Sequence, residues 1–370
     1  LAMLCANVMI YFQIVLISVR FVTALPLLKI TFFDIIVVVI SAWISEFIFK
    51  KLFPPRKMLL IYGEYDPTAF IQKVDSRKDK YKIEKIVDIS IGFEKIKEII
   101  PQYEGVIIYD LHSETRNLIL KFCYANDIRA YSTTKVSDIL IRGAESLHIF
   151  DTPLLLYRNR GLNFEQRVMK RTMDIIVSGI MLIITSPIFL IASAAIKLYD
   201  GGPVFYRQTR VTLNGKKFDI FKFRSMIVDA EKDGKSQPAA DKDPRITPVG
   251  RVLRATRLDE LPQLIDIFVG NMSLVGPRPE RVEHVEKYTD ELPEFAYRLK
   301  VRGGLTGYAQ IYGKYNTTPY DKLQLDLIYI QNYSIFLDLR LLLMTIKIMF
   351  MKESTEGFTE EQKEEIQEKN

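Results

Sequence analysis

Asp259 and Glu260 form an acidic pair in a segment that is otherwise rich in arginine. Residues 241–281 include seven basic residues, six of them arginine, and six acidic residues. The planar guanidinium of arginine can bind two phosphate oxygens at once. A carboxylate among such groups can attack phosphorus, or it can hold a divalent cation between phosphates. The segment therefore predicts phosphoryl-transfer chemistry. The alternative is a solvated helix face on which the two acids pair with Arg254 and Arg257.

Three motifs around this pair supply further basic residues. The first alternates aromatic and charged residues with the period of a strand, which predicts that Lys222 and Arg224 share a face. In the second, arginines at intervals of three are expected close to one helix face. The third is a proline-rigid turn with two arginines, Arg278 and Arg281. The motifs are FDIFKFR at 218–224, PRITPVGRVLRATR at 244–257 (with Arg251, Arg254 and Arg257) and GPRPER at 276–281.

The chain begins with apolar runs that are long enough for membrane helices. Residues 1–19 carry no charge and a second apolar run covers residues 30–49, so we predict transmembrane helices within 1–52. A cleavable signal peptide, the alternative for the first run, is disfavoured by its length and by the second run. Because the chain starts with leucine rather than methionine, we expect that part of the natural N-terminus is missing. Basic residues at 50, 51, 56 and 57 place the next segment in the cytoplasm.

Residues 56–150 are predicted to form a small Rossmann-like parallel α/β domain. A dinucleotide site would need Gly-x-Gly-x-x-Gly after the first strand. The turn found there has one glycine, Gly63, and two acidic residues, Glu64 and Asp66, which would repel a phosphate. We therefore favour a structural or regulatory role over nucleotide binding. Strand patterns at 57–62, 85–90 and 105–109 alternate with helical patterns at 67–74, 93–99 and 114–125.

A third apolar segment precedes the arginine-rich motifs. Residues 175–196 have no charge, and a helix of that length can cross a bilayer. Ser186 and Pro187 lie in its middle, and the proline should bend it. Basic residues on both sides favour the cytoplasm for both ends, so we predict a re-entrant membrane helix at 172–196 that breaks at Pro187 and returns. An ordinary kinked spanning helix is the alternative. The flanking residues are Arg158, Arg160, Arg167, Lys170 and Arg171, then Lys197, Arg207 and Arg210.

The remaining features of the sequence limit which classes of partner the chain can have. The mainly apolar segment 337–352 fits either an interfacial helix along lipid headgroups or a buried core helix. Residues 353–370 are rich in glutamate and read as a solvated acidic tail. The net charge of +6 suits an anionic membrane face or substrate but is too small to indicate nucleic acid. Cys5 and Cys123, the only cysteines, indicate neither a disulfide nor a zinc site.

The order of these motifs resembles the bacterial polyprenyl-phosphate sugar phosphotransferases, the monotopic phosphoglycosyl transferase superfamily. The resemblance covers residues 164–352 and implies a monotopic α+β catalytic domain there. The N-terminal helices and degenerate α/β domain are similar to the large form of that family, which initiates exopolysaccharide, capsule or O-antigen synthesis. Fewer N-terminal helices are readable here than in that form, so we expect a truncated bundle. The motifs are the Ser-Pro helix, GGPVFYRQ, FKFRSM, DPRITPVGRVLR, LDELPQL, NMSLVGPRPE and GGLTGYAQIYG.

The resemblance also implies a mechanism and a location. Asp259 matches the nucleophile of the family and would attack a UDP-sugar, releasing UMP. Glu260 would hold Mg²⁺ and could handle the proton of the acceptor, undecaprenyl phosphate. Lys222, Arg254 and Arg278 match basic phosphate-binding residues, and the motifs add Arg224 and Arg281 to these candidates. The implied location is the bacterial inner membrane, in contact with its lipid, with the catalytic domain on the cytoplasmic face and a homo-oligomer as a possible assembly.

Two other functions agree less well with the sequence. A membrane-tethered nucleotide-sugar dehydratase or epimerase would need a glycine fingerprint, which is absent, and a Tyr-x-x-x-Lys pair, for which Tyr320-Asp321-Lys322 has the wrong spacing. A non-enzymatic membrane scaffold would leave the arginines and the acidic pair without a purpose. Both are therefore disfavoured.

Overall fold

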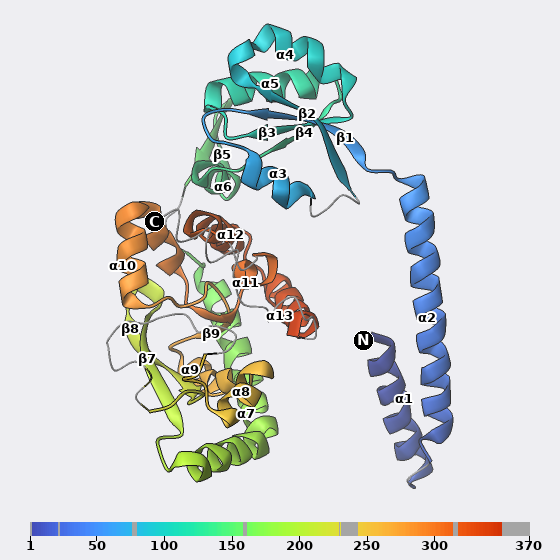
Figure 1. Cartoon of the computed structure of the whole chain (residues 1–370), viewed down its shortest axis with the longest axis vertical. Coiled ribbons are helices and arrows are strands. Elements are labelled where there is room, and N and C mark those ends of the chain that lie inside the picture. The colour runs from blue at the N-terminus through green and yellow to red at the C-terminus, as the bar shows by residue number, and fades with distance from the viewer. Residues whose placement is uncertain are drawn as a thin grey trace. The chain divides into compact units, whose positions relative to one another are not determined.

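The computed structural model describes residues 2–20, 23–75, 80–157, 161–228, 230, 243–313 and 317–349. Its contacts divide the chain into two compact units, Leu1–Thr133 and Thr134–Asn370 (Figure 1). The predicted acidic tail at 353–370 lies outside the described residues, as do Arg158 and Arg160. The predicted domain boundaries at 56–150 and 164–352 stay predictions.

Two apolar helices begin the first unit. α1 covers Ala2–Ser18 and α2 covers Leu25–Leu52, close to the predicted apolar runs. A proline in the first turn of α2 suits a position where backbone N–H groups have no partner within the helix. None of the residues of α2 is buried, and its last turn holds Lys50 and Lys51. By length and composition, α2 could cross a membrane.

A parallel four-stranded sheet forms the rest of the first unit, which confirms a mixed α/β fold with a parallel sheet. The strand order is β2-β1-β3-β4, and apolar residues of β1 and β3 are fully buried, as parallel strands covered on both faces require. α4 and α5 lie on one side of the sheet and α3 lies on the other (Figure 1). The strands are β1 (Arg56–Tyr62), β2 (Tyr81–Asp88), β3 (Gly105–Tyr109) and β4 (Arg129–Ser132); the helices are α3 (Thr68–Asp75), α4 (Phe93–Ile99) and α5 (Ser113–Ala125).

The second unit is held together by α7, which covers Phe164–Asp200 and so extends well beyond the predicted segment. Pro187 inside α7 cannot donate to the carbonyl of Ile183, one turn earlier. The Ser186 hydroxyl donates to that carbonyl instead, at 2.8 Å. The Ser-Pro pair therefore breaks the backbone ladder and satisfies the carbonyl that the break leaves. The axis of α7 changes direction along its course (Figure 1), as expected for a helix with an internal proline.

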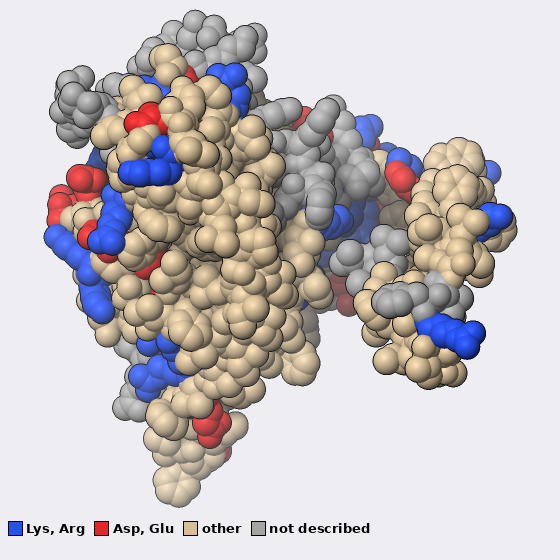
Figure 2. Space-filling view, turned by 90° about the horizontal axis from the view of Figure 1, so that it is seen from below, with Lys and Arg blue, Asp and Glu red and all other residues tan. Residues whose placement is uncertain are grey.

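Much of the surface of α7 is apolar. Ile183, Leu190 and Ile191 have exposed fractions of 75%, 73% and 70%. Figure 2 shows a broad face without charged residues, with lysine and arginine toward its margins. Among the described residues, α2 and α7 are the helices long and apolar enough to cross a membrane. These two helices indicate that the protein associates with a membrane.

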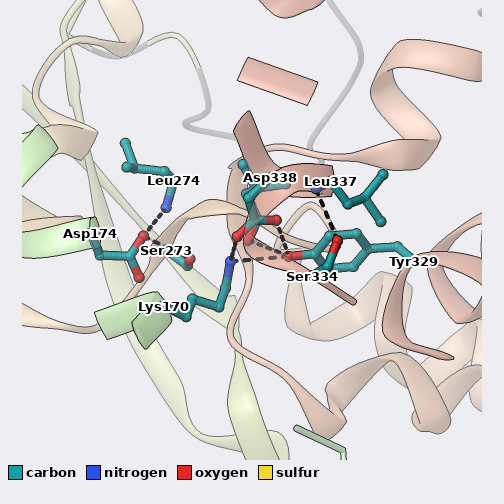
Figure 3. A network of polar contacts seen from close by, with 9 residues as sticks. Lys170, Asp174, Ser273, Leu274, Tyr329, Ser334, Leu337 and Asp338 are labelled. Atoms are coloured by element: carbon teal, nitrogen blue, oxygen red, sulfur yellow. Dashed lines mark hydrogen bonds and ion pairs between the residues drawn. The ribbon is translucent and has the colours of Figure 1, made fainter. Parts of the chain in front are cut away.

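The start of α7 is fixed to the second unit by a buried polar network (Figure 3). Lys170 donates to Asp338 at 2.6 Å and to the Tyr329 hydroxyl at 3.0 Å, and that hydroxyl donates to Asp338 at 2.8 Å. One turn later, Asp174 accepts hydrogen bonds from the Ser273 hydroxyl and the Leu274 N–H. These groups are buried, and their hydrogen bonds tie α7 to the segments packed on it.

The other elements of the second unit pack around a core that includes Ile267, Val275, Phe295 and Leu323. β7 and β8 form an antiparallel ribbon, β9 and β10 a short parallel pair, and β5 and β6 a separate hairpin. The elements are α6 (Val136–Arg142), β5 (Glu145–Ile149), β6 (Thr152–Leu156), β7 (Phe205–Val211), β8 (Lys217–Phe223), α8 (Pro248–Ala255), the 3₁₀ turn η4 (Leu258–Glu260), α9 (Gln263–Val269), β9 (Ser273–Val275), α10 (Val282–Glu291), the 3₁₀ segment η5 (Pro293–Lys300), β10 (Gly304–Thr306), α11 (Tyr308–Tyr312), α12 (Pro319–Gln331) and α13 (Ile335–Met349).

α13 bears on the two alternatives for residues 337–352, because it has a buried face and an exposed face. One face carries Asp338 and Leu341, which are fully buried. The other face exposes Phe336, Leu339 and Leu343. The helix therefore packs into the core and also presents an apolar stripe.

Candidate active site

The acidic pair lies on η4, in the short connection between α8 and α9. α8 begins at a threonine cap, where the Thr247 hydroxyl accepts from the Gly250 N–H, and it ends at Ala255. Arg257 then adopts a left-handed conformation (φ 56°), which turns the chain into η4. The prediction that Arg251, Arg254 and Arg257 lie close to one helix face is therefore wrong for Arg257, because the helix ends before it.

Glu260 is held by two cations from different elements. Lys222 of β8 and Arg278 of the turn after β9 donate to its Oε1 atom at 2.8 and 2.6 Å. Burial alone would raise the pKa of Glu260, but the charges and hydrogen bonds of Arg278 and Lys222 outweigh it and lower this pKa far below the usual range. Glu260 therefore stays ionised at any working pH.

Asp259 has the opposite electrostatic setting. Burial and the adjacent Glu260 charge raise its pKa, and the charges of Lys222 and Arg254 oppose that shift. The neighbouring carboxylates thus differ: Glu260 is neutralised by direct ion pairs, whereas Asp259 faces cations that act on it at longer range. Such a split between adjacent acids is typical of sites in which the two have different tasks.

Three of the predicted phosphate-binding residues meet at this pair. Lys222, Arg254 and Arg278 all act electrostatically on Asp259 or Glu260. Arg278 keeps 41% of its side chain exposed, and Lys222 keeps 21%. These cations can therefore still be reached by a ligand. A negatively charged group placed beside Asp259 would meet fixed positive charge at once.

Arg224 lies elsewhere, although it belongs to the same motif as Lys222. β8 ends at Phe223, so strand alternation no longer determines where Arg224 points. Its guanidinium pairs with Asp200 at the end of α7, with one bond of 2.8 Å and a second contact to the other carboxylate oxygen. Gly202 packs against this guanidinium, since a Cβ at that position would lie 2.6 Å from it. Arg224 therefore links α7 to the strand that carries Lys222.

Arg281 is the N-cap residue of α10, and its backbone forms an isolated antiparallel β-bridge with Arg210 of β7. It follows Glu280, whose carboxylate accepts from Lys322 at 2.8 Å and lies 3.6 Å from Arg298. Arg298 and Lys322 lie outside the arginine-rich motifs, so the motifs did not predict that they belong here. Only their position behind the Gly-Pro-Arg-Pro turn identifies them.

The donor set allows a magnesium ion only in a limited way. Within the part of the chain that the structure describes, no three His, Cys, Asp or Glu side chains group as metal ligands. Mg²⁺ is, however, commonly held by one or two carboxylates together with substrate phosphates. Asp259 and Glu260 supply the hard oxygen ligands for that mode, and the hydrogen bonds from Lys222 and Arg278 end on the same oxygen of Glu260. The residues present therefore fit a metal that arrives with a phosphorylated substrate.

Known proteins are similar to this chain over much of its length. A family model described as bacterial sugar transferase matches residues 165–352. A UDP-glucose:undecaprenyl-phosphate glucose-1-phosphate transferase of Klebsiella pneumoniae is 38% identical over 79% of this chain and 60% of its own length. A UDP-N-acetylgalactosamine-undecaprenyl-phosphate N-acetylgalactosaminephosphotransferase of Aeromonas hydrophila is 31% identical over 86% of this chain and 73% of its own.

A third relative carries another sugar in its name. The undecaprenyl-phosphate galactose phosphotransferase of Salmonella typhimurium is 37% identical over 54% of this chain and 44% of its own length. The chain thus spans less than two thirds of the first and third of these relatives. Relatives of similar identity are named for glucose, N-acetylgalactosamine and galactose, so overall similarity does not select a sugar.

Proposed function

This chain belongs to the bacterial sugar transferase family, and we propose that it transfers a sugar 1-phosphate from a UDP-sugar to undecaprenyl phosphate, as the initiating step of exopolysaccharide, capsule or O-antigen synthesis. The observation that carries this proposal is the acidic pair itself. Asp259 has a raised pKa and, among the described residues, no direct ion pair, and it lies beside a Glu260 that holds Lys222 and Arg278 in place. This arrangement supports a carboxylate nucleophile that acts in a field of fixed cations.

The first step in the proposal is attack of an Asp259 carboxylate oxygen on the β-phosphorus of the UDP-sugar. An O–P bond forms to the aspartate, the bond from that phosphorus to the bridging oxygen breaks, and UMP leaves with the electron pair. A phosphosugar–aspartyl ester remains. Negative charge spreads over the phosphoryl oxygens in the transition state. Lys222 and Arg278 stabilise it because Glu260 already orients them, and Arg254 adds positive charge nearby.

In the second step an oxygen of undecaprenyl phosphate attacks the same phosphorus. The Asp259–phosphorus bond breaks, the carboxylate is regenerated and undecaprenyl-diphospho-sugar leaves. The acceptor phosphate needs no strong base, since it is already ionised near neutral pH. Glu260 would be a poor base in any case at its lowered pKa. Its task in this proposal is to hold Lys222 and Arg278.

Asp259 and Glu260 are the residues that would hold Mg²⁺ together with the substrate diphosphate. When bound, the metal would neutralise phosphate charge and polarise the phosphoryl group. Arg224 and Arg281 enter the proposal as further phosphate contacts, and for Arg224 this requires release from Asp200.

The membrane helix gives the two substrates a common meeting place. The exposed apolar surface of α7 and the Ser186–Pro187 break support a re-entrant helix that inserts from the cytoplasmic face of the inner membrane. A catalytic unit anchored in one leaflet would meet a soluble UDP-sugar and a lipid-linked phosphate at the interface. Neither substrate then has to cross the bilayer.

The direct test uses the whole chain in membranes with Mg²⁺, undecaprenyl phosphate and a panel of UDP-sugars, with UMP as the readout. One UDP-sugar should release UMP continuously, and EDTA should stop the release. Without undecaprenyl phosphate the same sugar should release a single equivalent of UMP per enzyme, because the aspartyl ester accumulates. Absence of UMP with every sugar would refute the transfer, and continuous release only with the acceptor present, without the stoichiometric phase, would refute the covalent intermediate.

A further inference from the structure

The turn that presents Arg278 has an unusual set of hydrogen bonds. Four successive backbone carbonyls, those of residues 277–280, each accept from a different donor. Pro277 and Pro279 have no N–H group, so the turn cannot be held by hydrogen bonds of its own in the usual way. The donors are Gly304 N–H to Pro277 (2.9 Å), Arg298 Nη2 to Arg278 (3.0 Å), Arg210 Nη1 to Pro279 (3.2 Å) and Val211 N–H to Glu280 (3.0 Å).

Two of these four donors are arginine side chains. Arg298 has an exposed fraction of only 2%, so it cannot meet a ligand itself. It is oriented by Asp326, which accepts from its Nε and Nη2 atoms at 2.9 and 2.8 Å, and its guanidinium lies 4.8 Å from the centre of the Phe295 ring. A planar guanidinium bridges a carboxylate and a carbonyl through a rigid fork of N–H donors, whereas the flexible ammonium of lysine offers no such fixed geometry.

Arg210 holds the next carbonyl, that of Pro279. Its Nη2 donates to Gln208 at 2.6 Å while Nη1 reaches Pro279. Burial and the nearby Arg278 charge lower the pKa of Arg210 to about 10. A third guanidinium so close to Arg278 is electrostatically unfavourable by itself, so its placement calls for a function that offsets the repulsion.

We propose that Arg298 and Arg210 are positioning residues that act through Arg278, holding its backbone so that its guanidinium meets the diphosphate of the sugar donor. The inference rests on the proposed function for the identity of that ligand. Fixing the turn in advance removes the entropy cost of ordering Arg278 when the phosphate binds. It also explains why arginines, rather than smaller donors, fill these two positions.

A double-mutant cycle tests this with the full chain in detergent and Mg²⁺. The affinity for UDP and kcat/KM for UMP release are measured for Arg298→Lys, Arg278→Ala and the double variant. Arg298→Lys keeps a cation for Asp326 but cannot also reach the Arg278 carbonyl. We expect it to weaken both quantities about tenfold alone and less than about twofold when Arg278 is already alanine.

The contrary result is an equal loss in both backgrounds, which would make Arg298 a general structural residue and overturn the inference. Arg210→Lys in the same cycle covers the case in which Arg298→Lys fails to fold. Arg207→Lys is the matched control. Arg207 lies on β7 like Arg210, but its guanidinium stacks on Phe221 of β8 (4.7 Å to the ring centre). This substitution should change neither the affinity for UDP nor kcat/KM. UDP binding can be measured without the acceptor, so the two proposals can fail separately. If the two substitutions are coupled in UDP binding but no transfer occurs, the proposed function alone is refuted. If transfer occurs but the substitutions are not coupled, this inference alone is refuted.

Discussion

The two units bury different kinds of side chain. Among the described residues, every buried polar or charged side chain lies in the second unit, whereas the buried side chains of the first unit, such as Leu60 and Ile108, are apolar. Burial of a charge costs free energy unless a partner compensates it. The second unit meets that cost repeatedly, at Lys170, Arg298 and Asp326. Among the described residues, buried charges are therefore confined to the unit that carries the acidic pair.

The substitution with the largest expected effect on activity is at Asp259, in the unit with buried charges. Asp259→Asn removes the nucleophile but keeps the size of the side chain, so transfer of phosphosugar should fall on the order of a thousandfold or more. The raised pKa of Asp259 indicates that its charge does not stabilise the fold, so thermal stability should not drop. UMP release and thermal unfolding measure the two quantities. Near-normal turnover would remove Asp259 from the mechanism.

The next effect separates Glu260 from its neighbour. Glu260→Gln leaves Lys222 and Arg278 without their common counter-charge, and both cations lose their fixed positions. We expect kcat to fall on the order of a hundredfold, as for the loss of a preorganised electrostatic contact. Steady-state kinetics with the preferred UDP-sugar would show this. An unchanged kcat would mean that the two cations are held by other groups.

The next prediction compares the two cores directly, in the free energy of unfolding rather than in rate. Asp338→Asn leaves the buried Lys170 charge without its partner and should destabilise the second unit by about 3–5 kcal/mol. Ile108→Val in the first unit removes one buried methyl group and should cost about 0.5–1.5 kcal/mol there. Hydrogen exchange of amides in α13 and β3 reports each unit separately. If the isoleucine change cost more, the contrast between the two cores would be lost.

The smallest effect is a shift in pH dependence. Only the ionised form of Asp259 can attack, and its pKa is raised by burial and by Glu260, so kcat/KM should rise with pH through a value above that of an ordinary aspartate. Glu260→Gln removes one cause of the raised pKa. The acid limb of the profile should therefore move to lower pH in the residual activity of that variant. A limb that stays in place would belong to another group.

The same contrast explains what could be predicted from the sequence. Fully apolar strands are easy to recognise in a sequence, so the predicted bounds of Gly105–Tyr109 match the observed ones. The alternation of such strands with helices also predicted the parallel sheet. β4 was missed because its four residues, Arg129–Ser132, are short and only partly buried. In the site, the motifs predicted that Asp259, Glu260, Lys222 and Arg278 belong together. Which cation meets which carboxylate depends on turns that leave no periodic signal.

Two particular residues show where sequence reasoning could not reach. Lys170 was counted among the basic residues that flank a membrane helix, yet it is buried against Asp338, far along the chain. Arg224 shares a motif with Lys222 but follows the last residue of the strand, where alternation no longer applies, and it pairs with Asp200. In both cases a long, flexible side chain found a partner that only the folded chain brings near.

The hydroxyl of Ser186 makes the proline beside it tolerable, and this has an evolutionary consequence. Without that serine, the carbonyl of Ile183 would face an apolar medium with no donor, whereas without the proline an alanine could stand in for the serine at little cost. The two residues can therefore be replaced without cost in only one order. A lineage that straightens this helix must give up the proline first, and a lineage that acquires the bend must already carry the hydroxyl.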